Sequence, residues 1–217
     1  MPSSYFCTLG VAFSLLLSVL ISPDVHAGKL VRRLSYNSHP DSVFIMDNAL
    51  VYVNNALLVY TPDATVAFGI TRHIIDPVRG NSQYILTDHY GGIILVLDSY
   101  DDTCFSKTHY NDKHGLSRFK VDPRGIKADK WYISTATMPG VKFVFERNIF
   151  NKGGKIVNEN TDKVVATLSV EDRKEPWLLS LFHSKSGYVL RTDGTLPAYD
   201  LAALMALVQM RVDLCGL

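Results

Sequence analysis

The stretch Pro197-Ala-Tyr-Asp-Leu-Ala-Ala-Leu-Met-Ala-Leu-Val-Gln-Met-Arg-Val-Asp-Leu-Cys215 decides the fold. Every residue from Leu201 to Val208 is apolar, and all of them except Val208 are strong helix formers, so the stretch predicts a helix. Asp200 lies at its front end, where a carboxylate can accept hydrogen bonds from free backbone N–H groups. Because this helix is apolar on all sides, we expect other parts of the protein to surround it.

A membrane span is the weaker alternative for this helix. From Asp200 to Cys215 it would reach roughly 24 Å, which is less than the hydrocarbon thickness of a bilayer. Polar residues also interrupt its apolar surface near the end, at Gln209, Arg211 and Asp213. The sequence therefore favours a helix that is buried in protein.

The chain before this helix has the pattern of short strands separated by turns. From Val141 to Phe150, apolar and polar residues alternate with period two, and turn residues such as Pro62-Asp63 and Asp122-Pro123-Arg124-Gly125 separate the segments. We predict no second helix of any length, which argues against an α/β sheet. The predicted strands are Val43–Ile45, Leu50–Val53, Leu57–Thr61, Thr65–Ile70, Gln83–Leu86, Ile93–Leu97, Arg118–Val121, Lys130–Ala136, Val141–Phe150, Lys155–Asn158, Lys163–Glu171, Trp177–His183 and Tyr188–Arg191.

These elements together predict a mainly β fold, in which about twelve strands form a closed barrel around a central hydrophobic C-terminal helix. The helix pattern Asp-x-Ala-x-x-x-Ala-Leu-Val, together with Asp/Asn-x-x-Gly turns between strands, resembles the tubby C-terminal-like superfamily and, more narrowly, its LURP-one-related branch. The helix pattern is carried by Asp200, Ala202, Ala206, Leu207 and Val208.

The resemblance spans about residues 42–217 and implies a twelve-stranded barrel wrapped around a hydrophobic helix. For function it implies phosphoinositide binding, as in tubby proteins, or lipid movement, as in phospholipid scramblases. The LURP-one branch itself implies no settled biochemical activity. Most members of the superfamily are intracellular, whereas this chain begins with a leader-like segment. No family site residue matches a position of this sequence well enough to be carried over.

The first 27 residues resemble a signal peptide. Residues 1–23 carry no charge, Tyr5–Ile21 is apolar, and Val25-His26-Ala27 suits cleavage after Ala27. We therefore expect a signal peptide over 1–27, a polar lead over 28–41, the barrel domain over 42–217, and secretion. One alternative is a single N-terminal membrane anchor. A second is a GPI-anchored precursor, with cleavage near Gly187, although charged residues are awkward in such a tail.

A basic segment, Lys113–Lys155, is the best candidate for ligand binding. It holds ten Lys or Arg residues against three acids, whereas the whole chain has a net charge of +1. Alternating strands would gather many of these cations on one outer face, which would attract anionic phospholipid headgroups, a membrane surface or phosphorylated ligands. The alternative is a solvated barrel exterior. The candidate binding residues are Arg118, Lys120, Arg124, Lys127, Lys130, Lys142 and Arg147.

Two cysteines, Cys104 and Cys215, remain after the predicted leader is removed. In an oxidising compartment they can form a disulfide, and the alternative is one buried thiol and one loop thiol. Around Cys104 the segment Asp98–His114 is rich in Asp and His, but it lacks the spacing of a calcium or zinc site, so we predict no metal and no cofactor.

No catalytic motif is present, neither Gly-x-Ser-x-Gly nor His-Glu-x-x-His nor a complete phosphate loop. We therefore expect a secreted, non-enzymatic binding protein that recognises anionic lipid headgroups or phosphorylated ligands through the basic face. The alternative is a protein-interaction module or secreted effector, in which exposed Tyr and Phe side chains contact a protein partner. A hydrolase with an unrecognised site is the least favoured hypothesis. The near-balanced charge gives no indication of nucleic-acid binding.

Overall fold

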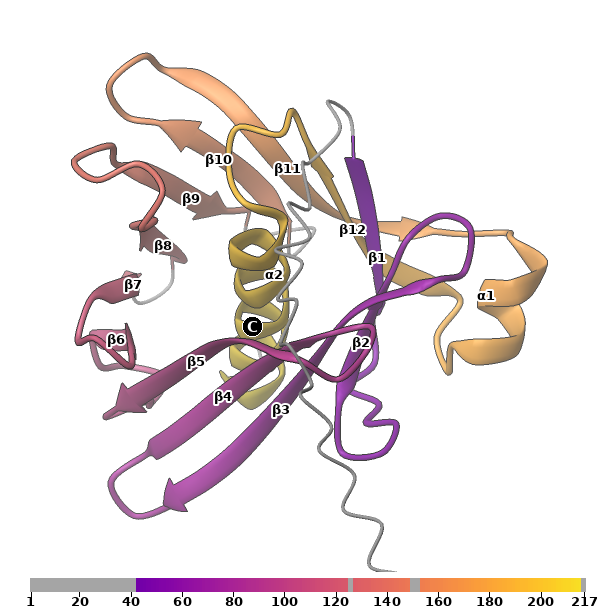
Figure 1. Ribbon diagram of the computed structural model, residues 1–217, viewed down its shortest axis with the longest axis horizontal. Coiled ribbons are helices and arrows are strands. Elements are labelled where there is room, and N and C mark those ends of the chain that lie inside the picture. Colours follow the sequence, from indigo (N-terminus) through magenta and orange to yellow (C-terminus); the bar gives the residue numbers. More distant parts are fainter. Residues whose placement is uncertain (1–41, 125–126, 149–152, 216–217) are drawn as a thin grey trace, which may run out of the picture. The chain divides into compact units, whose positions relative to one another are not determined.

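A closed antiparallel barrel surrounds the C-terminal helix α2 (Ala198–Cys215), as Figure 1 shows. The computed structural model describes residues 42–124, 127–148 and 153–215. Within these residues the barrel has twelve strands. They are β1 (Ser42–Asp47), β2 (Leu57–Tyr60), β3 (Val66–Asp76), β4 (Asn81–Asp88), β5 (Ile93–Tyr100), β6 (Thr108–Asp112), β7 (Ser117–Arg124), β8 (Lys127–Ile133), β9 (Phe143–Arg147), β10 (Gly154–Asn158), β11 (Lys163–Asp172) and β12 (Ser186–Thr192).

The strands are connected as a simple meander. Each strand from β2 to β11 pairs with the strands before and after it in the chain, and β1 closes the barrel by pairing with β12 from Ser42↔Thr192 to Asp47↔Gly187. Among the described strands each one has a hydrogen-bonded neighbour on both sides, so none is an edge strand. The predicted fold class, a mainly β barrel around a hydrophobic terminal helix, is confirmed.

Helix α2 fills the inside of the barrel. Every residue from Leu201 to Val212 is buried, and inward-facing side chains of the strands, including Trp131, Phe119 and Phe143, pack in the same core. A barrel of about eight strands is filled by its own side chains, so a wider one needs a further element inside. The helix supplies that element, and the barrel supplies the apolar surroundings that the helix requires.

The polar end of α2 is bound to the barrel as well. Gln209 donates from Nε2 to the backbone oxygen of Asp47 at the end of β1, over 2.8 Å. In the described part of the chain, no helix is long and apolar enough to cross a membrane.

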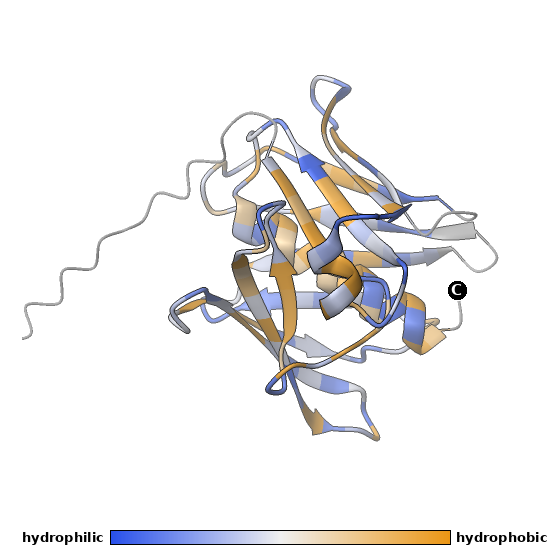
Figure 2. Cartoon of the chain, turned by 90° about the vertical axis from the view of Figure 1, so that its right-hand side faces the viewer, coloured by the Kyte–Doolittle hydropathy of each residue, from blue (hydrophilic) through white to orange (hydrophobic). Residues whose placement is uncertain are grey.

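Two predicted strands are wrong. The segment predicted as a strand over Trp177–His183 forms a short helix, α1 (Pro176–Leu181), where proline suits the first helical turn. Strands β11 and β12 pair directly with each other, so this segment is an excursion between them, held by ring contacts of Trp177 and Phe182 with Tyr60. In Figure 2, in which α1 faces the viewer, hydrophobic and hydrophilic residues are mixed along both this helix and the strands.

The other incorrect strand is Leu50–Val53. This segment forms a loop with a single bridge, Val53↔Ala56, because Asn54 and Asn55 both adopt positive φ and turn the chain tightly. Asparagine tolerates this conformation better than most residues do. The predicted signal peptide, residues 1–27, and the predicted polar lead, residues 28–41, lie outside the described residues.

The first prediction concerns the dependence of the fold on α2. Leu204→Ala removes a side chain that is 1 % exposed and leaves a cavity in the middle of the barrel, so it should lower the free energy of unfolding by about 2–5 kcal/mol. Leu214→Ala, on the same helix but 52 % exposed, is the matched control and should cost less than about 0.5 kcal/mol. Urea unfolding followed by circular dichroism measures both. Equal losses would contradict the central position of the helix.

Candidate functional site

The inside of the barrel leaves little room for a ligand. A cavity of about 10 Å³ lies beside the C-terminal half of α2, which is close to the space that one water molecule needs. Its lining is formed by Arg72, Tyr84, Asp102, Tyr110, Leu207, Met210, Arg211 and Leu214. The outside of the barrel is therefore where a binding surface is expected.

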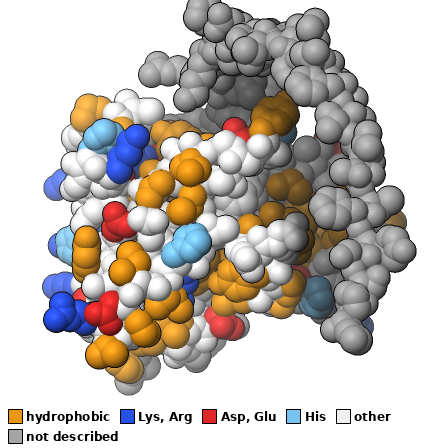
Figure 3. All heavy atoms as spheres, turned by 60° about the horizontal axis from the view of Figure 1, so that its bottom comes forward, with side chains coloured by type: hydrophobic (Ala, Val, Ile, Leu, Met, Phe, Trp, Pro, Cys, Tyr) orange, Lys and Arg blue, Asp and Glu red, His pale blue; other side chains and the backbone are white. Residues whose placement is uncertain are grey.

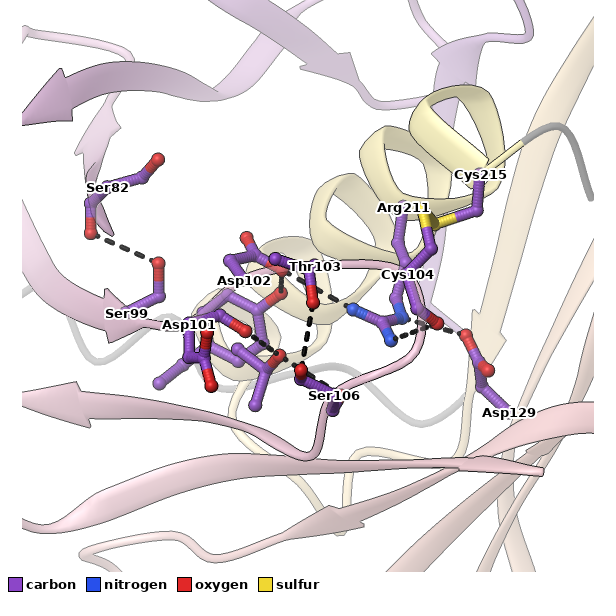
Figure 4. A network of polar contacts seen from close by, with 12 residues as sticks. Ser82, Ser99, Asp101, Asp102, Thr103, Cys104, Ser106, Asp129, Arg211 and Cys215 are labelled. Carbon is purple, nitrogen blue, oxygen red and sulfur yellow. Dashed lines mark hydrogen bonds and ion pairs between the residues drawn. A yellow bond between two sulfur atoms is a disulfide. The ribbon is translucent and has the colours of Figure 1, made fainter. Parts of the chain in front are cut away.

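A buried arginine on α2 is the centre of a buried polar network (Figure 4). Arg211, which is 3 % exposed, donates from Nε to Asp129 Oδ2 over 2.9 Å, and its Nη1 lies 3.4 Å from Asp102 Oδ1. Its Nη2 donates to the backbone oxygen of Cys104 over 3.2 Å. A buried charge is tolerated when it is paired and hydrogen-bonded in this way.

Two tyrosines complete the coordination of the Asp102 carboxylate. Tyr84 donates to Oδ2 over 2.7 Å, and Tyr110 donates to Oδ1 over 3.0 Å. Burial, reinforced by the nearby Asp102 charge, raises the pKa of both phenols well above the ordinary value, so both remain protonated donors. The network therefore joins β4, β6 and α2 to the loop between β5 and β6.

A disulfide joins the same loop to the end of α2. Cys104 and Cys215 are bonded, with their Cα atoms 5.4 Å apart, and they lie beside Arg211 in Figure 4. This is one of the two arrangements that the sequence left open. The bond closes a loop of 111 residues and fixes the β5–β6 loop to the helix next to the Arg211 network.

A second buried ion pair lies at the opposite end of α2. Arg118 on β7 is 3 % exposed and donates from Nη2 to Asp200 Oδ1, while its Nη1 lies 3.8 Å from Asp112 Oδ2. Burial raises the pKa of Asp200, and the Arg118 charge opposes that rise. Asp200 was predicted to cap the helix by accepting from backbone N–H groups. The carboxylate pairs with Arg118 instead, because α2 begins at Ala198 and Asp200 is its third residue rather than the residue before the helix.

The five candidate residues whose side chains the structure describes do not form a continuous basic surface. The prediction that Arg118 and Arg147 lie on an outer face is wrong, because they are 3 % and 7 % exposed. The side chains of Arg124 and Lys127 lie outside the described part of the chain. Of the remaining candidates, Lys120 and Lys130 are half-buried and Lys142 is exposed.

Strand register explains why the cations do not accumulate. Asp122 on β7 lies opposite Lys130 on β8, Lys130 lies opposite Glu146 on β9, and Glu146 lies opposite Lys155 on β10. Lys130 Nζ approaches Glu146 Oε1 to 3.3 Å. Charges of opposite sign therefore alternate across four strands, an arrangement that cross-strand pairing favours.

A surface groove of about 550 Å³ lies over the same strands. It is lined by two of the predicted binding residues, Lys130 and Lys142, but also by three carboxylates, so its formal charge is −1. The carboxylates belong to Glu146, Glu159 and Asp162. The groove is therefore not a ready-made anion site.

Exposed apolar side chains gather at the end of the barrel where α2 finishes. We call this surface the barrel end; it comprises Ile74, Ile75, Val78, Tyr100, Phe105 and Leu214, with exposed fractions between 52 % and 93 %. Figure 3 turns the lower part of Figure 1 toward the viewer and shows hydrophobic side chains spread over this face, with Lys and Arg side chains at one margin. The disulfide and the Arg211 network lie directly behind it.

Sequence reasoning assigned no role to the barrel end or to the Arg211 network. The signal available was Arg211 itself, because a charged residue in an otherwise apolar helix requires a buried partner. Cys215 lies four residues later and hence on the same helix face, which places any partner of that cysteine near Arg211. Within the described residues, no group of three or more His, Cys, Asp or Glu side chains is arranged to hold a metal ion.

Comparisons with known proteins add one likeness. No family model matches the chain, and no curated protein matches it. Among solved structures, the chain is similar to a protein from Arabidopsis thaliana whose X-ray structure is known, with 11 % sequence identity and a TM-score of 0.46. The alignment covers 81 % of this chain and 92 % of that chain.

The second prediction concerns Arg211. Arg211→Met leaves Asp102 and Asp129 buried without their cation, so the free energy of unfolding should fall by about 3–5 kcal/mol in urea. Adding Asp129→Asn removes one unpaired charge and should recover part of the loss. Arg191→Met is the control, because its pair with Glu171 is partly exposed and should contribute less than about 1 kcal/mol. An Arg211→Met protein as stable as the parent would refute the role of this network.

Proposed function

We propose that this protein is a secreted, non-enzymatic binding module that recognises its partner on the outside of the barrel, through the barrel end. The filled lumen is the observation that supports the proposal. Barrels that carry small ligands hold them inside, but here α2 occupies that space and the cavity beside it has a volume of about 10 Å³. Membership of the tubby C-terminal-like superfamily, in its LURP-one-related branch, is part of the same proposal.

The barrel end has two properties of a binding surface. It exposes six large apolar or aromatic side chains on elements that a disulfide and a backbone hydrogen bond from Asp102 to Gly80 hold together, whereas isolated exposed apolar residues are ordinary on protein surfaces. It also rests on a rigid base, because the disulfide and two contacts of Arg211, with Asp102 and with the Cys104 carbonyl oxygen, hold the loop that carries Phe105. Binding surfaces gain affinity when they are fixed before the partner arrives.

The third prediction tests the barrel end as a general contact surface. The double variant Val78→Asp with Phe105→Asp changes two side chains that are 93 % and 89 % exposed, so the fold should be unaffected. When labelled protein is incubated with homogenised source cells and recovered with its binding partners, the variant should be retained about tenfold less. Tyr90→Asp, a 78 % exposed aromatic residue in the β4–β5 turn at the other end of β4, is the matched control. Retention equal to that of the parent would refute the proposal.

A second candidate function is the binding of anionic lipid headgroups or phosphorylated ligands by the cations that remain on the outer face. Lys142 is exposed and Lys120 is half-buried, so both are accessible to such a ligand. This candidate is less favoured because acids alternate with the cations across β7 to β10.

The fourth prediction decides whether this second candidate is correct. Lys120→Glu with Lys142→Glu should weaken binding to immobilised phosphoinositides by about tenfold at physiological salt, since each cation near an anionic surface contributes on the order of 1 kcal/mol. Lys163→Glu, which reverses a cation that already pairs with Asp193 on another part of the barrel, is the control. Binding that is unchanged, or absent from the parent protein, would exclude the second candidate.

A further inference from the structure

Strand β3 is longer than its neighbour β2, so part of its edge has no partner strand. The pairing of β2 with β3 ends at Leu57↔Ile70, whereas β4 pairs with β3 as far as Asp76. The paired ends of β3 and β4 therefore extend past the start of β2, as Figure 1 shows. Both faces of this projecting hairpin are open, because the consecutive residues His73 and Ile74 are both exposed.

The turn between β4 and β5 determines which backbone groups lie along the free edge. Asp88, the last residue of β4, donates its N–H to the Gly92 carbonyl oxygen over 2.9 Å, so its backbone groups face β5. Backbone groups alternate in direction along a strand, so every second residue of β4 back to Ser82 faces β5 as well. The residues of β3 opposite these positions include Arg72 and Ile74. Their N–H and C=O groups therefore face away from β4, on the side where β2 has ended.

These four backbone groups form a short row without a partner. Within the described residues, no backbone group is hydrogen-bonded to them. Unpaired N–H and C=O groups along a strand are a template on which another strand can pair. Only a polypeptide backbone offers donors and acceptors at the matching spacing, so the ligand that this edge fits is a strand.

We propose that the free edge of β3 pairs with the same edge of a second copy of this chain. The two strands run antiparallel about a two-fold axis at His73, so that Arg72 lies opposite Ile74 of the second copy and Ile74 lies opposite its Arg72. The four groups of one edge then bond to the four groups of the other, and none is left over. This inference rests on the proposed function, because Ile74 and Ile75 belong to the barrel end, and it names the partner of that surface.

The side chains along the edge are compatible with this pairing. Ile74 and Ile75 are 60 % and 64 % exposed, and both lose exposed apolar surface when a second strand lies beside β3. The Arg72 guanidinium lies 5.7 Å from the centre of the Tyr84 ring and donates from Nη2 to Ser82 Oγ over 3.2 Å. These contacts hold the cation against β4 of its own chain, so two copies of Arg72 do not bring unpaired charges together at the edge.

A second copy fits the edge better than a flexible peptide does. A disordered peptide loses conformational freedom when it becomes a strand, whereas β3 of the second copy is already extended and held by β4. The tip of the hairpin is fixed as well, because Asp102 donates from its N–H to the Gly80 carbonyl oxygen over 3.0 Å. Pairing of two such edges therefore requires little ordering of either chain.

One other stretch of strand in this part of the barrel lacks a second neighbour, but it is irregular. The pairing of β5 with β6 begins only at Leu97, so Ile93–Val96 is unpaired on one side. Ile94 has no directly opposite residue in β4, which makes it a bulge that bends the strand and disturbs the spacing of its backbone groups. By contrast, β3 pairs in unbroken register with β4 from Phe68 to Ile74. The edge of β3 is therefore the better template.

The fifth prediction is tested by sedimentation velocity on the chain purified from its own source, with the disulfide intact. The parent should convert from monomer to dimer as its concentration rises. Ile74→Lys should raise the dissociation constant of the dimer by about tenfold or more, since a lysine on an edge opposes strand pairing. Its fold should be unaffected because Ile74 is 60 % exposed. Ile93→Lys, which changes a 66 % exposed isoleucine on β5, is the matched control and should dimerise as the parent does.

A second variant tests the backbone bonds themselves. Ile74→Pro removes an N–H that faces the free edge and leaves the hydrogen bonds from β3 to β4 in place, and proline is tolerated at such positions. This variant should also raise the dissociation constant of the dimer. Its folding is checked by circular dichroism, and if it does not fold, Ile74→Lys alone decides.

Hydrogen exchange locates the contact on β3. The amides of Arg72 and Ile74 should exchange more slowly at concentrations where the dimer forms, because they become hydrogen-bonded only there. The amide of Ile70, which lies opposite Leu57 of β2 in every chain, is the internal reference and should not depend on concentration.

A chain that remains monomeric up to about 1 mM would overturn the inference. So would a dimer that Ile93→Lys disrupts and Ile74→Lys does not, because its contact would then lie on β5. The proposed function would survive either result if the Val78 and Phe105 variant still lost its retention in the homogenate, since the barrel end would then contact a different protein.

Discussion

A helix without a polar face determines this structure. Helix α2 buries every residue from Leu201 to Val212, so it has to be enclosed on all sides, and a sheet can enclose it completely only by closing into a barrel. Closure in turn gives every described strand a hydrogen-bonded neighbour on both sides. Twelve strands in the described chain give a lumen wide enough for a helix, and the small residues Ala202, Ala203 and Ala206 let the surrounding aromatic side chains approach it. Helix and barrel therefore stabilise each other.

Apolar packing alone does not fix how α2 is rotated about its axis or how deeply it lies in the barrel. The buried ion pairs fix both the rotation and the depth. Arg118 holds Asp200 in the first turn of α2, and Asp102 and Asp129 hold Arg211 in the last turns. Each pair is costly to separate because it is removed from water, so sliding the helix by one residue would leave charges unpaired. The Cys104–Cys215 disulfide adds a covalent restraint at the same end as Arg211. The buried ion pairs therefore select one position of α2 among several that would bury similar apolar surface.

The sequence predicted the terminal helix from a run of apolar helix formers and the strands from their period-two alternation, and both signals are local. The closed barrel followed from the need to enclose that helix. The prediction that seven cations lie together on an outer face was less successful. Arg118 and Arg147 are buried, and Lys130 lies between acids from neighbouring strands. Those positions depend on strand register and on residues eight or more positions away, which periodicity does not reveal. Trp177 was misassigned for a similar reason: a six-residue helix is too short to show a period, and its stability comes from aromatic contacts with Tyr60.

Because the lumen is filled, residues that bind a ligand have to lie on loops and outer strand faces, which is where rigid scaffolds usually carry them. The β5–β6 loop shows how one segment can carry an exposed side chain and still stabilise the core. Asp102 and Cys104 contact Arg211, and Cys104 is bonded to Cys215 of α2, whereas Phe105 is 89 % exposed. The same short segment therefore anchors the helix and displays an apolar side chain, so the contacts that fix the core also set the position of the outer surface.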